Sequence, residues 1–423
     1  MTTEPRVINR SDHPISRNQI SANALKVLYR LNNSGFRACL VGGAVRDLLL
    51  GVQPKDFDIA TDAKPEEVKS LFKNSRLIGR RFRLAHILYG REIIEVATFR
   101  GHHDEGSSGE LHEDGRIIRD NVYGTIEEDA MRRDFTVNAL FYDISNFTVL
   151  DYCDALADIE RRQLRLIGDP VKRYQEDPVR MLRAIRLAAK LNLDIEAKTL
   201  EPIKQLGKLL LNISGGRLWD ESQKMLLAGH SKVTFQQLES EQIIAVLLPQ
   251  THVCLTEMPF CRPFINLALE NTDLRIKEEK PVNPSFLYAC FLWWPVQRLK
   301  HELMLDGYSP AEAMQQATTQ VIEAQVKLIS IPRRFTQFIR DVWLLQHRLE
   351  SRRGKRISTL IQHKRFRAAY DFLVLRAKVK EIPSDAAEWW TQFQEVSTEE
   401  QSGMLKGLKN HPRKRKSRKN QFR

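Results

Sequence analysis

Two aspartates separated by one residue are the part of this sequence with the clearest chemical potential. Asp56 and Asp58 flank Phe57, and on a β-strand both of their side chains leave the same face. Carboxylates arranged in this way are hard oxygen ligands that suit Mg²⁺, which keeps open positions for water and substrate phosphates. The pattern predicts a Mg²⁺ site; its alternative is an ordinary Asp-x-Asp pair in a loop.

Glu95 is a candidate third acid. It lies within the apolar run Ile93–Ala97, where an unpaired carboxylate would be costly, and a metal ion facing the side chain would satisfy it. Exposure at a sheet edge or an ion pair with Arg100 is the alternative. We therefore predict that Asp56, Asp58 and Glu95 are catalytic and that the two aspartates bind the metal.

A pair of glycines precedes these acids and indicates a phosphate-binding turn. Gly42 and Gly43 let the backbone come close to a triphosphate, and they open a predicted helix whose N–H groups are available to an anion. Arg46, about one turn into that helix, is placed to fork onto phosphate oxygens. Gly-Gly followed by Arg46-Asp47 and then by Asp-x-Asp is a specific combination.

Residues 132–138 form a segment that is basic where a core helix should be apolar. It contains Arg132, Arg133, Asp134 and Asn138. The arginines are candidates for contact with a nucleotide. The alternative is that they only pair with the acidic residues at 127–129.

Residues 176–186 form a second such segment. It opens with Glu176 and Asp177 before a proline, and Asp-Pro is a good helix start. The arginines that follow, Arg180, Arg183 and Arg186, form a slanted stripe along one side of the expected helix, against which a base edge or phosphates would lie. An ordinary N-cap at Asp177 and solvated arginines are the alternatives.

The order of predicted elements indicates an α/β head followed by a helical remainder. In the head, a helix is expected at Ala22–Leu31 and strands at Ala38–Val41, Phe57–Ala60, Ala85–Tyr89, Ile93–Thr98 and Ala139–Ile144. Later helices are expected at Asp177–Leu191, Gly215–Leu227, Phe235–Leu248, Pro284–Leu305, Pro310–Ile329 and Phe335–Glu350. We predict a polar arm at 1–20, a head at 21–150, a helical neck at 151–227, a helical body at 228–400 and a disordered basic tail at 401–423.

The composition favours an anionic partner and an intracellular protein. The chain has 423 residues, a formal net charge of +13 and five cysteines without a CxxC pair, which fits reduced thiols in a cytoplasm. We expect a soluble, cytoplasmic protein with no leader and no transmembrane segment. The run from Gly101 to Asn121 contains several histidines and acids, but its composition indicates a solvated loop rather than a zinc site.

The basic tail is the predicted RNA-binding element. Its cationic residues are Arg413, Lys414, Arg415, Lys416, Arg418 and Lys419. Such a block neutralises phosphates regardless of sequence, although a merely solubilising tail would look the same.

At this point the motifs identify a resemblance. The chain resembles the class II nucleotidyltransferases, which include the bacterial poly(A) polymerases and the CCA-adding tRNA nucleotidyltransferases. The motifs lie between residues 25 and 225. The resemblance implies a polymerase-β-like palm with a small mixed sheet and helices, followed by an all-α neck, body and C-terminal region.

The resemblance also assigns roles to the residues above. It places Asp56 and Asp58 at the metal-binding carboxylates and Glu95 where a third acid is expected. The remaining candidates would bind the nucleotide: Gly42, Gly43 and Arg46 at its phosphates, Arg133, Asp134 and Asn138 at its sugar and phosphates, and Glu176, Asp177 and Arg180 at the base edge. Asp47 and Arg183 complete the predicted nucleotide-binding residues.

The segment Leu77–His86 looks like the one that marks bacterial poly(A) polymerases rather than CCA-adding enzymes. The function implied is addition of AMP from ATP to RNA 3′ ends with release of pyrophosphate and with Mg²⁺ as cofactor. RNA and ATP are the expected partners, together with proteins of RNA decay. The alternatives are a CCA-adding enzyme and an RNA-binding protein that has lost catalysis, which the intact carboxylates disfavour.

Overall fold

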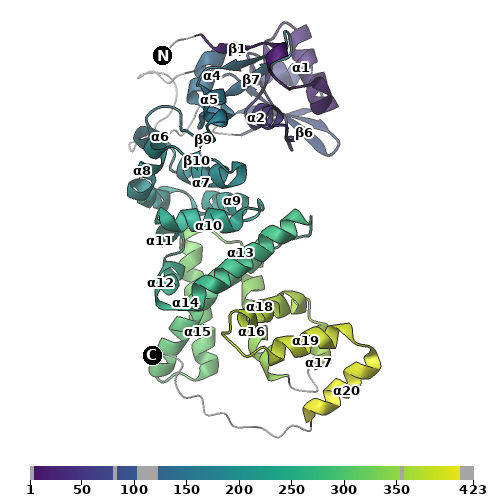
Figure 1. The fold of residues 1–423 in the computed structure, drawn as a ribbon, viewed down its shortest axis with the longest axis vertical. Coiled ribbons are helices and arrows are strands. Elements are labelled where there is room, and N and C mark those ends of the chain that lie inside the picture. Colours follow the sequence, from purple (N-terminus) through teal and green to yellow (C-terminus); the bar gives the residue numbers. More distant parts are fainter. Residues whose placement is uncertain (1–3, 80–82, 102–121, 353–356, 410–423) are drawn as a thin grey trace. The chain divides into compact units, whose positions relative to one another are not determined.

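The computed structural model describes residues 4–79, 83–101, 122–352 and 357–409. The chain divides into two compact units, Met1–Ile213 and Ser214–Arg423. The first unit holds the head and the helices that follow it, and the second is built from helices (Figure 1).

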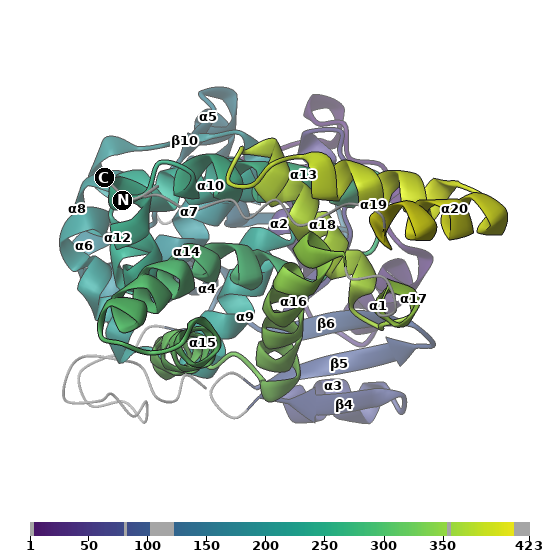
Figure 2. The same ribbon diagram turned by 90° about the horizontal axis from the view of Figure 1, so that it is seen from below.

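The described part of the first unit contains an eight-stranded mixed sheet with the strand order β1-β8-β7-β2-β3-β6-β5-β4. The strands are β1 Arg6–Ile8, β2 Ala38–Val41, β3 Asp58–Thr61, β4 Ser75–Ile78, β5 Leu84–Tyr89, β6 Glu92–Thr98, β7 Leu140–Asp143 and β8 Thr148–Asp151. Strands β3 and β6 pair in parallel, and the other neighbours pair antiparallel. Figure 2 shows β6, β5 and β4 side by side at one edge.

The residues predicted as a polar arm, 1–20, belong in part to this sheet. Strand β1 pairs with β8 at the opposite edge from β4. Ile8, Ile15 and Ile20 are buried in the head core. The prediction of an arm was wrong here because three isolated isoleucines in a polar stretch give no periodic signal, although each fills a position in the core.

The two faces of the sheet are covered to different extents. One face packs on the larger core, to which helices α1 (Ala22–Asn33), α2 (Gly43–Leu49) and α3 (Pro65–Leu71) contribute. The other face has a smaller core of Cys39, Val41, Ala60, Phe141 and neighbours, packed with helix α4 (Ile126–Arg132). Asp58, Glu95 and His86 belong to this second face, because in each strand they alternate with residues of the larger core.

Helices complete the first unit beyond the sheet. They are α5 Ala155–Glu160, α6 Pro170–Glu176, α7 Val179–Leu191 and α8 Ala197–Leu206, with a two-stranded sheet of β9 Gln163–Leu164 and β10 Asp194–Ile195 between them. Helix α7 is amphipathic and buries Met181, Leu182 and Ile185. Arg180, Arg183 and Arg186 therefore lie outside this buried face of the helix, as the sequence predicted.

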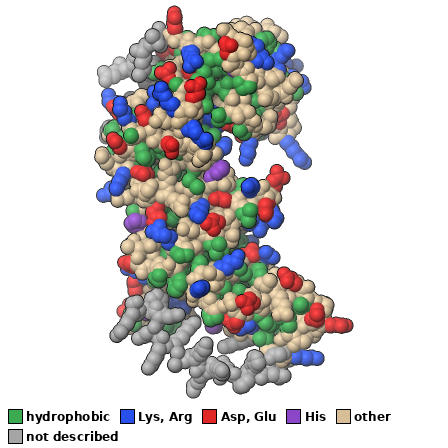
Figure 3. Space-filling model, viewed as in Figure 1, with side chains coloured by type: hydrophobic (Ala, Val, Ile, Leu, Met, Phe, Trp, Pro, Cys, Tyr) green, Lys and Arg blue, Asp and Glu red, His purple; other side chains and the backbone are tan. Residues whose placement is uncertain are grey.

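The second unit consists of consecutive helices. They are α9 Gly215–Leu226, α10 Ser231–Ser240, α11 Ile243–Leu247, α12 Pro249–Glu257, α13 Cys261–Lys277, α14 Pro284–Leu305, α15 Pro310–Leu328, α16 Arg333–Ser351, α17 Ile357–Ile361, α18 Phe366–Lys378, α19 Asp385–Glu395 and α20 Thr398–Lys409. The helix predicted at 235–248 is two helices, because Gln242 adopts a left-handed conformation with φ of 60°. On the face shown in Figure 3, positive and negative side chains are interspersed.

Aromatic packing and one buried arginine hold the second unit together. Phe372 contacts Phe264, Phe286 and Trp293 edge-on. The guanidinium group of Arg376 lies 4.7 Å from the centre of the Trp293 ring. Arg376 also forms ion pairs with Glu350 and Glu381, at 2.6 and 2.9 Å.

Candidate active site

The two predicted metal ligands lie at the start of strand β3. Asp56 precedes the strand and Asp58 is its first residue. Both are exposed, whereas Phe57 between them is buried. This exposed–buried–exposed order is the one that extended backbone produces, and it supports the prediction that both carboxylates leave on the same side.

The electrostatics of Asp58 are those of a crowded acid. Burial by surrounding protein atoms, and then the negative charge of Glu95, raise the pKa of Asp58 to about 6. Asp56 adds to this rise, and Arg133 opposes it. The ionised form is therefore disfavoured in the protein alone and would gain from a cation.

Glu95 lies beside Asp58, but for a different reason from the one expected. The two residues are register partners in the parallel pair β3 and β6, so their side chains leave the same face. The Glu95 side chain is 50% exposed and Oε1 lies 3.0 Å from Nε2 of His86. The idea that burial forces Glu95 to seek a metal was wrong, because the apolar run alternates and Glu95 occupies an outward position.

Gly42 makes the turn between β2 and α2. Its φ of +70° is unfavourable for other residues, and a Cβ built on it would lie 3.3 Å from Nη1 of Arg133. Arg133 in turn packs 4.9 Å from the centre of the Phe141 ring and pairs with Asp129 at 2.9 Å. The turn therefore places glycine backbone next to the positive charge of Arg133. The ion pair of Arg133 with an acid at 127–129, which the sequence offered as the alternative, is present as well.

Arg46 does not project from α2 toward a ligand. It is 3% exposed, and its Nε donates to Oδ1 of Asp47 at 2.9 Å. Its Nη1 donates to the side-chain oxygen of Asn138. These partners occupy the guanidinium group inside the head, and contact between Arg46 and phosphates stays a prediction.

Asp134 joins this network to helix α7. Its Oδ2 accepts a hydrogen bond from Nε of Arg183 at 2.7 Å, and its Oδ1 accepts from the backbone N–H of Phe135 at 2.9 Å. Asn138 Nδ2 lies 3.5 Å from Oδ1. Burial opposes ionisation of Asp134, yet its pKa lies below the usual range because Arg183 and these donors stabilise the carboxylate.

The residues predicted to recognise the base also contact one another. Oε2 of Glu176 accepts from Nη1 of Arg180 at 2.8 Å and from Nη1 of Arg173 at 2.9 Å. Asp177 lies between α6 and α7, and its Oδ1 accepts from the backbone N–H of Val179 at 3.4 Å. The predicted helix start is confirmed at this junction.

Sequence reasoning missed Arg173. Its Nη2 donates to the backbone oxygens of Arg132 and Arg133, at 2.7 Å each, and so ties α6 to the arginine-rich segment. Arg173 precedes Glu176 by about one helical turn, and Arg180 follows Glu176 by about one turn. This spacing is the signal in the sequence that could have identified Arg173.

Lys190 is a second residue that sequence reasoning missed. Burial lowers its pKa. The charge of Asp47 works in the opposite direction, whereas Arg46, Arg186 and Lys55 add to the lowering. Asp47 and these cations therefore lie close enough to Lys190 to influence its pKa.

The donor set suits a metal that also binds substrate. Among the described residues, no three His, Cys, Asp or Glu side chains form a group that could by itself hold a metal ion. Mg²⁺ needs no such cage, because one or two carboxylates together with substrate phosphates are its usual ligands. The crowded, exposed pair Asp56 and Asp58 fits that pattern.

Some predicted features lie elsewhere or outside the described residues. Outside them lie the tail residues 413–419, the histidines of the 102–121 segment and residues 80–82.

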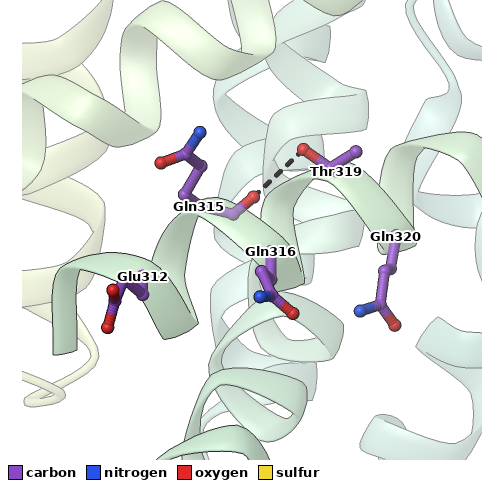
Figure 4. Close-up of a pocket in the computed structure, with 5 residues that line it drawn as sticks. All are labelled: Glu312, Gln315, Gln316, Thr319 and Gln320. Carbon is purple, nitrogen blue, oxygen red and sulfur yellow. Dashed lines mark hydrogen bonds between the residues drawn. The ribbon is translucent and has the colours of Figure 1, made fainter. Parts of the chain in front are cut away.

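A shallow hollow in the second unit is lined by side chains of α15 and holds no predicted site residue (Figure 4). Its lining is Glu312, Gln315, Gln316, Thr319 and Gln320.

The described helices include none that is both long and apolar enough to cross a membrane.

A solved structure of a CCA-adding enzyme in an apo form has a TM-score of 0.64 with 19% identity, covering 94% of this chain and 95% of that one. That likeness confirms the expected fold class: a nucleotidyltransferase head with a mixed sheet, followed by helices.

Sequence comparison is more specific. Residues 38–165 match the poly A polymerase head domain, residues 192–255 a probable RNA and SrmB-binding site of polymerase A, and residues 306–423 the polymerase A arginine-rich C-terminus. Poly(A) polymerase I of Salmonella typhimurium is 47% identical, over 97% of this chain and 91% of its own length. The CCA-adding enzyme of Lactobacillus helveticus is 40% identical over 50% of this chain and 52% of its own length. The chain belongs to the poly(A) polymerase I family and is a polynucleotide adenylyltransferase.

Proposed function

We propose that the chain transfers AMP from ATP to the 3′ end of RNA without a template and releases pyrophosphate. The observation that carries this proposal is the group formed by Asp58 and Glu95, side by side on an exposed part of the sheet, near the positive charge of Arg133. Acids alone would repel a nucleotide, and the arginine beside the Gly42 turn provides the complementary charge.

Asp56 and Asp58 would hold Mg²⁺ in this reaction. When bound, the metal lowers the pKa of the attacking 3′ hydroxyl and neutralises charge on the leaving phosphates. The carboxylates would contribute oxygen ligands and negative charge. The Gly42–Gly43 turn lets the triphosphate approach the backbone, and Arg133 faces it with a guanidinium group held by Asp129.

Asp177 and Arg180 would read the base. An acceptor and a donor match the N6 amino group and N1 of adenine, and a mismatched polar group left without a partner costs about 1–3 kcal/mol. Cytosine offers the same pattern of donor and acceptor, so these residues alone do not exclude CTP. We propose that pocket shape excludes it and that Gly79–His86 contributes to that shape.

The RNA would be held through its phosphates by the basic tail and by the region 192–255. A tailing enzyme meets many unrelated 3′ ends, for which contacts that ignore sequence serve well. We further propose that proteins of RNA decay are partners and that the enzyme works in the cytoplasm.

The test is incubation of the purified full chain with an oligoribonucleotide, Mg²⁺ and each nucleotide separately. Long ladders with ATP only would support the proposal. Addition of two C residues and one A residue to a tRNA transcript, followed by a stop, would replace it with CCA addition. RNA binding without incorporation of any nucleotide would favour the non-catalytic alternative.

A further inference from the structure

A histidine contacts one of the acids of the site. Nε2 of His86 lies 3.0 Å from Oε1 of Glu95, and because an ionised carboxylate can only accept, we assign the hydrogen to Nε2. The two residues are register partners in the antiparallel pair β5 and β6. Backbone pairing therefore fixes their proximity.

Glu95 stands between two neighbours in one row across the sheet. Asp58 is its register partner in β3 and His86 its partner in β5. Side chains in such positions are about 4.5–5.5 Å apart at Cβ, and like charges there repel each other. The carboxylates of Glu95 and Asp58 therefore push each other apart, and the hydrogen bond to His86 gives Glu95 a fixed anchor on the side away from Asp58.

This hydrogen bond uses only one oxygen of Glu95. Within the described residues, Oε2 has no hydrogen-bond partner, and half of the side chain is exposed. A glutamate has three side-chain torsions, so an unanchored carboxylate would sample several positions. Anchoring Oε1 to a ring that is itself on a strand limits Oε2 to a small region beside Asp58.

We propose that His86 is a positioning residue for AMP transfer: its Nε2–H holds Oε1 of Glu95, so that Oε2 stays beside Asp58 and open to substrate. The proposal rests on the proposed function, because it assigns His86 a role in that same reaction. Arg76, the register partner of His86 in β4, is exposed and lies one strand further from the acids. It provides a matched control in the same row.

The test compares His86→Phe, which removes the donor and keeps a ring, with His86→Gln, which retains an N–H donor. AMP incorporation is measured over a range of ATP and Mg²⁺ concentrations for both variants, for Arg76→Gln and for Glu95→Gln with and without His86→Phe. We expect His86→Phe to lower kcat by roughly 10–100-fold, as loss of a residue that orients a ligand does. KM for ATP should change by less than about threefold, since ground-state binding is not altered.

Two further results are expected. His86→Gln should recover most of the rate, whereas Arg76→Gln should behave like the wild type. In the Glu95→Gln background, His86→Phe should cause little additional loss, because residues that act through one another are not additive.

Full activity of His86→Phe, equal loss in the Phe and Gln variants, or multiplicative losses with Glu95→Gln would each overturn the positioning role. If His86→Phe unfolds, the comparison of His86→Gln with the wild type, alone and with Glu95→Gln, decides the matter. A wild-type protein without AMP incorporation would instead refute the proposed function, so the two failures are distinguishable.

Discussion

The two units use arginines with fixed partners for different purposes. In the first unit, Arg46 and Arg183 bind Asn138 and Asp134 next to an exposed face that carries acids. In the second unit, Arg376 lies among Trp293, Glu350 and Glu381 inside a helical core. The same kinds of interaction therefore hold a surface in place in the first unit and join helices in the second. We expect only the function of the first unit to depend on small displacements of the side chains involved.

The largest effect should come from the acids of the first unit. Asp58→Asn should reduce AMP incorporation on the order of 10²–10³-fold, a loss typical of removing one group that stabilises developing charge. Glu201→Gln, which changes an exposed acid on α8, is the matched control and should leave the rate unchanged. Near-normal incorporation by Asp58→Asn would contradict the metal-binding assignment.

The same variant should gain stability in the absence of metal. The pKa of Asp58 is raised from 3.8 to about 6. Its favourable contribution to the free energy of unfolding is therefore fully present below about pH 4 and is lost as the pH rises through about 6. Asp58→Asn carries no such charge, and its unfolding temperature should therefore exceed that of the wild type at pH 7 but not at pH 4. Thermal unfolding at the two pH values measures this difference.

The second unit should respond to loss of Arg376 in stability. Arg376→Leu leaves Glu350 and Glu381 without their partner, at a cost of about 3 kcal/mol. Arg367→Leu on the same helix breaks an exposed ion pair with Asp371 and should cost under about 0.5 kcal/mol. Hydrogen exchange of each unit separates the effects; loss of protection in the head as well would show that the units are not independent.

A smaller loss of stability, confined to the first unit, is expected for Arg183→Gln. Removal of the charged hydrogen bond to Asp134 should cost about 2 kcal/mol. Since Arg183 lowers the pKa of Asp134, the lost stability is the part present at neutral pH, and the gap to the wild type should close as the pH falls. Unfolding in urea at pH 7 and at pH 2, below the usual pKa of an aspartate, measures it, with Arg161→Gln as an exposed control; equal gaps at both pH values would contradict the role of Asp134.

The smallest effect is expected from the basic tail. Removal of residues 410–423 should weaken RNA binding and flatten its salt dependence by about 0.7 in log-log slope for each phosphate that the tail no longer neutralises. Titration of a labelled oligoribonucleotide at several salt concentrations measures the slope. An unchanged slope would mean that the tail does not bind phosphates.

The sequence predicted the local elements better than the partners of the side chains. Strand β2 begins and ends at the predicted residues, because a buried apolar run stops at Gly42. Strands β1, β4 and β8 were missed because each mixes polar or charged residues with apolar ones over three or four positions and so lacks the uninterrupted apolar run of β2. Such short segments carry little periodicity.

Partners distant in the sequence could not be predicted from spacing. Arg46 finds Asn138, 92 positions away, and no local pattern shows that the guanidinium group points inward. That Asp56 and Asp58 leave on one side stays a prediction, because Asp56 precedes β3 and the alternation of the strand begins only at Asp58. The contact between His86 and Glu95 needed the register of β5 and β6, which only the folded sheet supplies.

Strand β1 has a practical consequence for anyone who makes this protein. Its three residues pair with β8 and occupy the hydrogen-bonding groups at that border of the sheet. Shortening the N-terminus past Ile8 would expose β8, and unpaired strand borders invite other copies of the chain to add on and aggregate. Purification tags should therefore be added ahead of Met1 without trimming the native residues.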